Sequence, residues 1–178
     1  MAEQDLVELV DDDGRATGSI TVGEAHQAPG RRHRAFSVVV LDRVGGRVLL
    51  QRRAEVKLRF AGAWANACCG HVPPGGDPAT SARRRLVEEL GLVADERFRE
   101  AGIHVYDAPD AVSGMVECEY DHVLVLEVEA TSVVLEPDPA EVSEVRWMPV
   151  EVVRRLAGTP QAAPWLAGVL AVAVPAAD

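Results

Sequence analysis

Hydrophobic positions along the chain repeat with two different periods. Residues 35–41 are almost continuously apolar and rich in valine, which predicts a buried strand, and residues 47–51 are expected to pair back with it after a turn. The same criteria predict strands at residues 5–10, 17–22, 97–106, 115–129 and 143–148.

Helical patterns cover three further segments. The helix expected to end at Gly91 can be capped by Asp77 or Thr80, with Pro78 in its first turn, and it places Arg85 and Glu89 on one face. A second helix is expected at residues 150–156. A third, at 164–174, lies in the most apolar part of the chain, which is too short to span a bilayer and is therefore expected to be a buried terminal helix.

These elements predict one domain over residues 1–178. The expected fold class is α+β, with a central mixed sheet and helices on both sides. Residues 52–77 carry no predicted helix or strand, and loops of that length are usually functional. The loop leads into a helix that ends with Glu88 and Glu89, an arrangement suited to holding a divalent metal ion and a phosphate.

Composition narrows the class of protein. Hydrophobic residues make up 48% of 178 residues, enough for a core that needs no disulfides. The three cysteines form no disulfide framework, and the N-terminal residues lack an apolar signal core, so we expect a cytoplasmic protein without a membrane span.

The charges are unevenly distributed. The net charge is −10, yet residues 31–85 contain twelve Arg and Lys residues and only three acids. One basic zone on an acidic protein favours a small anionic ligand over nucleic acid. The alternative is that these arginines are ordinary solvated charges.

Five separated residues form a possible metal-ligand set. Three histidines and two glutamates suit Zn²⁺, Mn²⁺ or Fe²⁺: His26, His33, His71, Glu117 and Glu119. The alternative is hydrogen-bonded histidines and a solvated acidic strand face, on which Asp121 also lies. His104 and His122 are expected to be structural.

One cysteine has possible catalytic surroundings. Cys69 lies beside His71 and basic residues, the kind of environment that tunes a thiol for proton transfer. The alternative role is a small buried apolar residue, which is the role expected for the adjacent Cys68.

The helix at residues 82–92 resembles the helical half of the Nudix box. Seven residues fit the spacing of that box: Gly70, Arg84, Leu86, Glu88, Glu89, Gly91 and Leu92. Two positions depart from it, because Gly76 and Arg85 stand where hydrolytic Nudix enzymes have glutamates that hold metals and orient water. This departure argues against hydrolysis of a diphosphate.

The segment Trp64-x-Asn66-x-x-Cys69-Gly70-His71 resembles the signature of type I isopentenyl diphosphate isomerases, which share the Nudix fold. The resemblance extends over most of the chain. It includes His26, the run from His33 to Ser37, Arg53, Lys57, Arg85, Glu89, Tyr106, Glu117, Glu119, Pro164 and Trp165.

The resemblance implies catalytic roles for Cys69, Glu119, Tyr106 and Trp165. Cys69 and Glu119 would move protons on opposite sides of a flat allylic unit, and the Trp165 indole would steady a tertiary cation. The common alternative for such a tryptophan is core packing, the role expected for Trp64 and Trp147.

The resemblance also implies ligands. His26, His33, His71, Glu117 and Glu119 would hold one Mn²⁺ or Zn²⁺ ion, and Glu89 would hold Mg²⁺ bridging to the diphosphate. Arg53, Lys57 and Arg85 would bind the phosphates. The family commonly has a lysine where Val22 stands, and Arg31 or Arg32 could replace it.

The expected function is therefore an isomerase that interconverts isopentenyl and dimethylallyl diphosphates through a carbocation. An alternative is a Nudix diphosphohydrolase acting on a nucleotide or prenyl diphosphate. A third is a non-catalytic fold that binds a prenyl diphosphate or a partner protein. All three bind a small molecule or a protein, and none binds nucleic acid.

Overall fold

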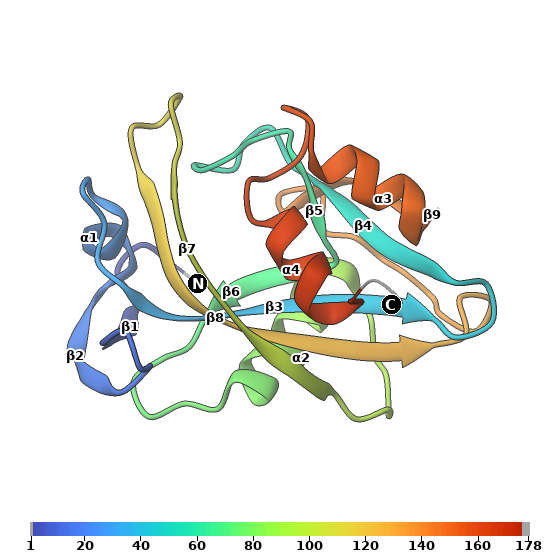
Figure 1. Cartoon of the computed structure of the whole chain (residues 1–178), viewed down its shortest axis with the longest axis horizontal. Coiled ribbons are helices and arrows are strands. Elements are labelled where there is room, and N and C mark those ends of the chain that lie inside the picture. The colour runs from blue at the N-terminus through green and yellow to red at the C-terminus, as the bar shows by residue number, and fades with distance from the viewer. Residues whose placement is uncertain (1, 176–178) are drawn as a thin grey trace.

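Two parallel strands form the centre of the computed structural model, which describes residues 2–175 (Figure 1). They are β3 (His33–Asp42) and β8 (Val116–Val128), which pair in unbroken register from His33 opposite Glu119 to Asp42 opposite Val128. Most of β3 is buried, as its continuous apolar sequence predicts.

The other strands extend the sheet from this pair. The antiparallel partners of β3 are β4 (Arg47–Arg53) at its C-terminal half and β6 (Cys68–His71) at its N-terminal half. β4 also pairs with β5 (Trp64–Asn66) and with β9 (Val142–Pro149). β8 forms a long hairpin with β7 (Arg99–Pro109), and the N-terminal hairpin of β1 (Leu6–Val10) and β2 (Ala16–Thr21) reaches β3 through Leu9 and His33.

Helices cover both faces of the sheet, as expected for this fold class. α2 (Pro78–Leu90) packs on one face through Leu86 and Leu90, against Phe36 of β3. α4 (Leu166–Ala173) packs on the opposite face with α3 (Val150–Ala157), as Figure 1 shows. The short α1 (Val22–His26) follows β2 directly.

The boundaries of α2 follow from its sequence. The Asp77 side chain accepts a hydrogen bond of 2.7 Å from the backbone N–H of Thr80, so Asp77 is the N-cap and Pro78 occupies the first turn. Gly91 adopts φ +62°, the left-handed conformation that terminates helices. Of the two caps expected from the sequence, Asp77 and Thr80, the structure has Asp77, and the helix ends at Gly91 as predicted.

The expected loop at residues 52–77 is partly wrong. Its central residues form β5 and β6, and the pairing of Cys69 with Ser37 places the cysteine on a strand rather than on a loop. These strands have no apolar alternation, because their extended state comes from pairing with β3 and β4. Irregular structure remains in the flanking parts of the loop, at residues 54–63 and 72–77.

Val22 is also placed differently from the prediction. Thr21 accepts a hydrogen bond from the backbone of Glu24 and caps a helix, so Val22 begins α1 instead of ending a strand. Its side chain is buried with Val7 and Ala25. Within residues 2–175, the structure contains no helix long and apolar enough to cross a membrane.

Candidate active site

A cavity of about 220 Å³ collects most of the residues that the sequence singled out. The predicted residues that line it are Arg53, Lys57, Cys69, His71, Arg85, Tyr106, Glu117, Glu119 and Trp165. Side chains that the sequence analysis did not select also line it, among them Glu3, Arg59 and Glu141.

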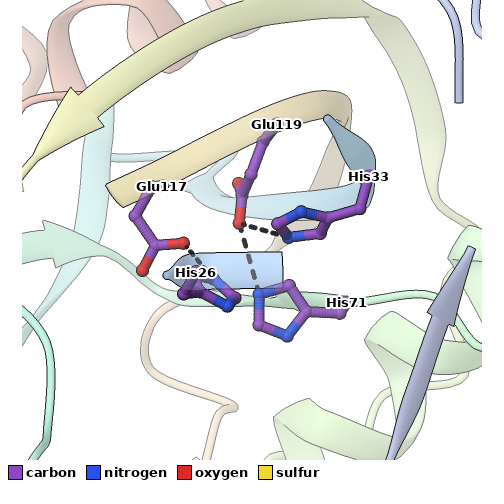
Figure 2. A group of neighbouring side chains, drawn as sticks. All are labelled: His26, His33, His71, Glu117 and Glu119. Carbon is purple, nitrogen blue, oxygen red and sulfur yellow. Dashed lines mark hydrogen bonds and ion pairs between the residues drawn. The ribbon is translucent and has the colours of Figure 1, made fainter. Parts of the chain in front are cut away.

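The five expected metal ligands meet beside this cavity (Figure 2). His26 ends α1, His33 begins β3, His71 ends β6, and Glu117 and Glu119 lie two apart on β8. Each of the five residues offers one ligand atom, and these atoms all lie within 4.8 Å of one another. His33 and Glu119 lie directly opposite each other on the two central strands, so the register between β3 and β8 brings these two ligands together.

Backbone carbonyls orient two of the histidine rings. His26 Nδ1 donates to the carbonyl oxygen of Val22 at 2.7 Å, and His33 Nδ1 donates to that of Arg31 at 2.8 Å. Because a carbonyl can only accept, each Nδ1 carries the hydrogen and each Nε2 is left to face the cluster. His33 Nε2 is buried and has no hydrogen-bond partner within residues 2–175, as expected for an atom that binds a metal.

The cluster is electrostatically suited to a cation. Burial, reinforced by the neighbouring histidines, lowers the pKa of His33 to about 4 and that of His71 to about 3, so both rings are neutral at neutral pH. Burial acts to raise the pKa of Glu117, but the hydrogen bond with His26 outweighs it and holds that pKa below its usual range. The neutral imidazoles of His33 and His71, together with the carboxylates, fit a divalent transition-metal ion.

The two carboxylate oxygens of Glu119 contact different groups. Its Oε1 lies 3.4 Å from His71 Nε2 and 3.8 Å from His33 Nε2, while its Oε2 accepts a hydrogen bond of 2.6 Å from the Tyr106 hydroxyl. Burial, together with the charge of Glu117, raises the pKa of Glu119 to about 7. One oxygen of the carboxyl group therefore faces the histidines while the other is held by Tyr106.

Cys69 lies on β6, and its thiol is hydrogen-bonded. Sγ is 3.2 Å from Asn66 Oδ1 and 3.6 Å from Ser37 Oγ. Burial, with the charge of Asp121, raises the pKa of the thiol to about 12, so the neighbouring basic residues do not make it a thiolate. The next residue is a glycine, Gly70, and a side chain at this position would be crowded, because its Cβ would lie 2.9 Å from the Phe36 ring. Cys68 is buried in the core on the α2 side, as expected.

Trp165 belongs to both the core and the cavity. It is only 3% exposed, its ring centroid is 6.0 Å from that of Tyr106, and its Nε1 donates to Asn66 Oδ1 at 3.2 Å. The Arg53 guanidinium carbon lies 5.7 Å from the centroid of the Trp165 ring. Trp165 therefore packs in the core and also lines the cavity, and the role of its indole in steadying a cation stays a prediction.

Three of the expected phosphate-binding and metal-binding side chains form one ion-pair network. Arg85 pairs with Glu89 and Glu88 of α2 and, at 3.2 Å, with Glu141, which also pairs with Lys57. Glu89 is buried behind Arg85 and is not among the residues that line the cavity. An Mg²⁺ ion held by Glu89 at the cavity would therefore require this network to open.

Neither expected substitute for the missing lysine reaches the cavity. Arg31 is exposed, and Arg32 pairs with Asp12 and, at 3.2 Å, with Asp107. Arg59 lines the cavity instead.

The remaining histidines lie outside the metal cluster, as expected. His104 stacks on Tyr106 with ring centroids 5.0 Å apart, and His122 lies between Arg34 and Glu100. Arg59 belongs to the basic segment at 52–59, but no motif marks it. Glu3 and Glu141 lie in acidic segments, and no motif distinguishes them from the acids around them.

The chain is similar to known proteins over most of its length. Residues 31–169 match the NUDIX domain. The chain is 52% identical to an isopentenyl-diphosphate Delta-isomerase of Nocardia farcinica, covering 94% of this chain and 93% of the relative. It is 46% identical to one of Streptomyces coelicolor, covering 98% and 86%. The crystal structure of the Deinococcus radiodurans protein DR0079 shares the fold, with a TM-score of 0.69, 21% identity, and coverage of 93% and 97%.

Proposed function

Since the chain belongs to the NUDIX-domain family and, within it, to the isopentenyl-diphosphate Delta-isomerases, we propose that it interconverts isopentenyl and dimethylallyl diphosphates. The observation that carries this proposal is that Cys69 and Glu119 line the same cavity. A shift of a double bond needs two proton-transfer groups at one substrate, and these residues can supply them.

The reaction adds one proton and removes another. One group protonates the terminal CH₂ carbon of isopentenyl diphosphate, which leaves a tertiary cation, and the other removes a proton from C2 to form the new double bond. The substrate neither gains nor loses protons overall, and the two groups exchange roles in the reverse direction. Cys69 Sγ and the Glu119 carboxyl would each hold and release one proton.

Two aromatic residues support these groups. The Tyr106 hydroxyl donates to Glu119 Oε2 and so holds the carboxyl group in one orientation. The Trp165 ring offers a π face to the cation, and its burial helps to exclude water that would quench the cation.

Metal ions complete the proposed site. The residues that would hold one Mn²⁺ or Zn²⁺ ion are His26, His33, His71, Glu117 and Glu119. Such an ion would draw charge from the Glu119 carboxylate, and Mg²⁺ bound through Glu89 would offset the charge of the diphosphate. Arg53, Lys57 and Arg85 would bind the phosphate oxygens.

Incubation with isopentenyl diphosphate tests the function. The protein would be supplied with Mg²⁺ and with Mn²⁺ or Zn²⁺ in D₂O, and the products followed by proton and phosphorus NMR. We expect dimethylallyl diphosphate that carries solvent deuterium, with no released phosphate. Phosphate release would instead identify a hydrolase, and binding without turnover would identify a non-catalytic fold.

A further inference from the structure

Arg59 is a partly buried cation of the cavity to which neither the family resemblance nor the reaction assigns a role. It lies between β4 and β5, and its side chain is 12% exposed. It lines the cavity together with the expected phosphate-binding residues Arg53, Lys57 and Arg85.

The backbone around Arg59 is held from two sides. The Arg53 guanidinium donates to the carbonyl oxygen of Arg59 at 2.9 Å, and the backbone N–H of Phe60 donates to the buried Asp110 at 3.1 Å. A side chain that starts from such a fixed backbone loses less conformational entropy when it binds a ligand.

Two of the three guanidinium nitrogens of Arg59 are hydrogen-bonded to acidic side chains. Nε donates to Glu117 Oε1 at 3.2 Å, and Nη1 donates to the two carboxylate oxygens of Glu3 at 3.0 and 3.2 Å. Across the described residues 2–175, Nη2 takes part in no hydrogen bond. The contact of Nη1 with Met115 Sδ, at 3.7 Å, is weak.

The two acidic partners differ in how firmly they are held. Glu117 is buried, and its other oxygen, Oε2, lies 2.6 Å from His26 Nε2 in the metal cluster. The Glu3 side chain is 42% exposed, although its backbone carbonyl accepts a hydrogen bond from Gly23. Glu117 therefore anchors Arg59, whereas the Glu3 carboxylate can swing into solvent without disturbing the backbone.

The other cations that line the cavity already have partners within the protein. A further side chain could therefore help to bind the diphosphate. Lys57 and Arg85 share Glu141, and Arg53 Nε and Nη2 are engaged by backbone carbonyl oxygens. Val22 is buried in an apolar cluster with Val7 and Ala25, so α1 offers no cation at that position. A planar guanidinium can meet a phosphate through two parallel hydrogen bonds, which a lysine cannot do.

We propose that Arg59 binds the diphosphate of the substrate, and that Glu3 occupies its guanidinium until the diphosphate displaces it. This inference rests on the proposed function, because that function supplies the diphosphate. Arg59 is thereby a substrate-binding residue, and Glu3 is its displaceable partner.

Inorganic pyrophosphate is a suitable probe, because it carries the anionic group without the hydrocarbon. Its affinity for the metal-loaded protein would be measured by calorimetry in the presence of Mg²⁺. We expect Arg59→Gln to weaken pyrophosphate binding about tenfold or more, as loss of a charge-assisted hydrogen bond does, and to raise KM similarly with little change in kcat. Arg31→Gln, which removes the same charge outside the cavity, should leave both values unchanged.

Glu3→Gln tests the displaceable partner. Removing the competing charge should tighten pyrophosphate binding by roughly two- to tenfold at low salt, the range expected when one partly exposed ion pair no longer has to be broken. An unchanged or weaker affinity would remove Glu3 from the proposal.

The competing explanation is that Arg59 only orients Glu117 for the metal, and metal content distinguishes the two. If Arg59→Gln loses the transition metal, and pyrophosphate affinity is normal once the metal is restored, the proposal is overturned. Arg59→Lys keeps the charge, so it should retain part of the affinity and provides a second variant should the first fold poorly. Wild-type protein that binds pyrophosphate but does not isomerise isopentenyl diphosphate would refute the proposed function while leaving the test of Arg59 valid.

Discussion

At the scale of single residues, Asn66 connects the thiol and the indole of the cavity. Its Nδ2 donates to the carbonyl oxygens of Val38 and Cys68 at 3.1 and 2.8 Å, which fixes the orientation of the amide. Its Oδ1 then accepts from both Cys69 and Trp165, at 3.2 Å each. One amide thus holds two groups that lie almost 100 residues apart in the sequence.

Cys69→Ala is expected to abolish most isomerase activity while leaving the fold intact. Loss of a general acid–base group lowers rates by about 10² to 10⁴. The measurement is kcat, with circular dichroism to monitor folding. Cys68→Ala is the matched control, because the neighbouring thiol is buried in the core and has no role in the proposed reaction. A Cys69→Ala variant that kept more than about a tenth of the activity would rule out this assignment.

Trp165→Phe is expected to lower kcat roughly five- to thirtyfold, because phenylalanine keeps a ring but stabilises a cation less well. KM should change little, because the alkene of the bound substrate is neutral. The variant also loses the hydrogen bond from Nε1 to Asn66, so a lower melting temperature is expected as well. A lower melting temperature with an unchanged kcat would show that Trp165 only packs.

At the scale of elements, the sequence predicts those that are determined locally. The ends of α2 and the buried strand β3 follow from their own residues. β5 and β6 could not be found this way, because they are extended only through pairing with β3 and β4. The five metal ligands could be named from their residue types and from the family resemblance. That they meet in space could not be predicted, because it depends on the parallel register between β3 and β8. Arg59 was missed because a single charge in a basic segment carries no positional signal.

Asp77→Ala should lower the free energy of unfolding by about 1 kcal/mol, because it removes the side-chain cap of α2. For a protein of this size, that corresponds to a melting temperature roughly 2–4 °C lower. Asp77→Asn is the control, since its amide oxygen can still accept from Thr80. Equal loss in both variants would show that the negative charge matters rather than the hydrogen bond.

Removal of the transition metal should destabilise the protein, because the ligand cluster joins α1, β3, β6 and β8. A ligand present at a hundred times its Kd contributes about 2.7 kcal/mol, so chelation should lower the melting temperature by roughly 5–10 °C. Mn²⁺ or Zn²⁺ should restore it, and Mg²⁺ alone should not.

A variant with one ligand replaced, His33→Ala, should lose most of this response to chelator and metal. His122→Gln, which changes a histidine outside the cluster, should keep it. Full activity in Mg²⁺ alone, with no transition metal bound, would contradict the proposed metal centre.

At the scale of the whole molecule, the cavity draws on both halves of the chain and on both faces of the sheet. Arg85 comes from α2 on one face, and Trp165 immediately precedes α4 on the other. The β3–β8 pairing joins the N-terminal and C-terminal parts of the sheet. The single domain expected over residues 1–178 stays a prediction, and these connections within residues 2–175 are what such a domain requires.

The protein is therefore expected to unfold in one cooperative transition. Far-ultraviolet circular dichroism and tryptophan fluorescence should give the same midpoint in urea, because Trp147 packs against the core on the α2 side of the sheet, whereas Trp64 and Trp165 pack in the core on the α4 side. Two separated midpoints would indicate two independently folding units.

The parallel pairing of β3 with β8 also has a consequence for synthesis on the ribosome. β3 is complete at Asp42, but the partner that covers its other edge is complete only at Val128. At ordinary rates of synthesis, the two events are separated by roughly 4 to 17 seconds. During that interval, a very apolar strand is exposed in the nascent chain, which makes residues 35–41 the segment that a chaperone would be expected to bind first.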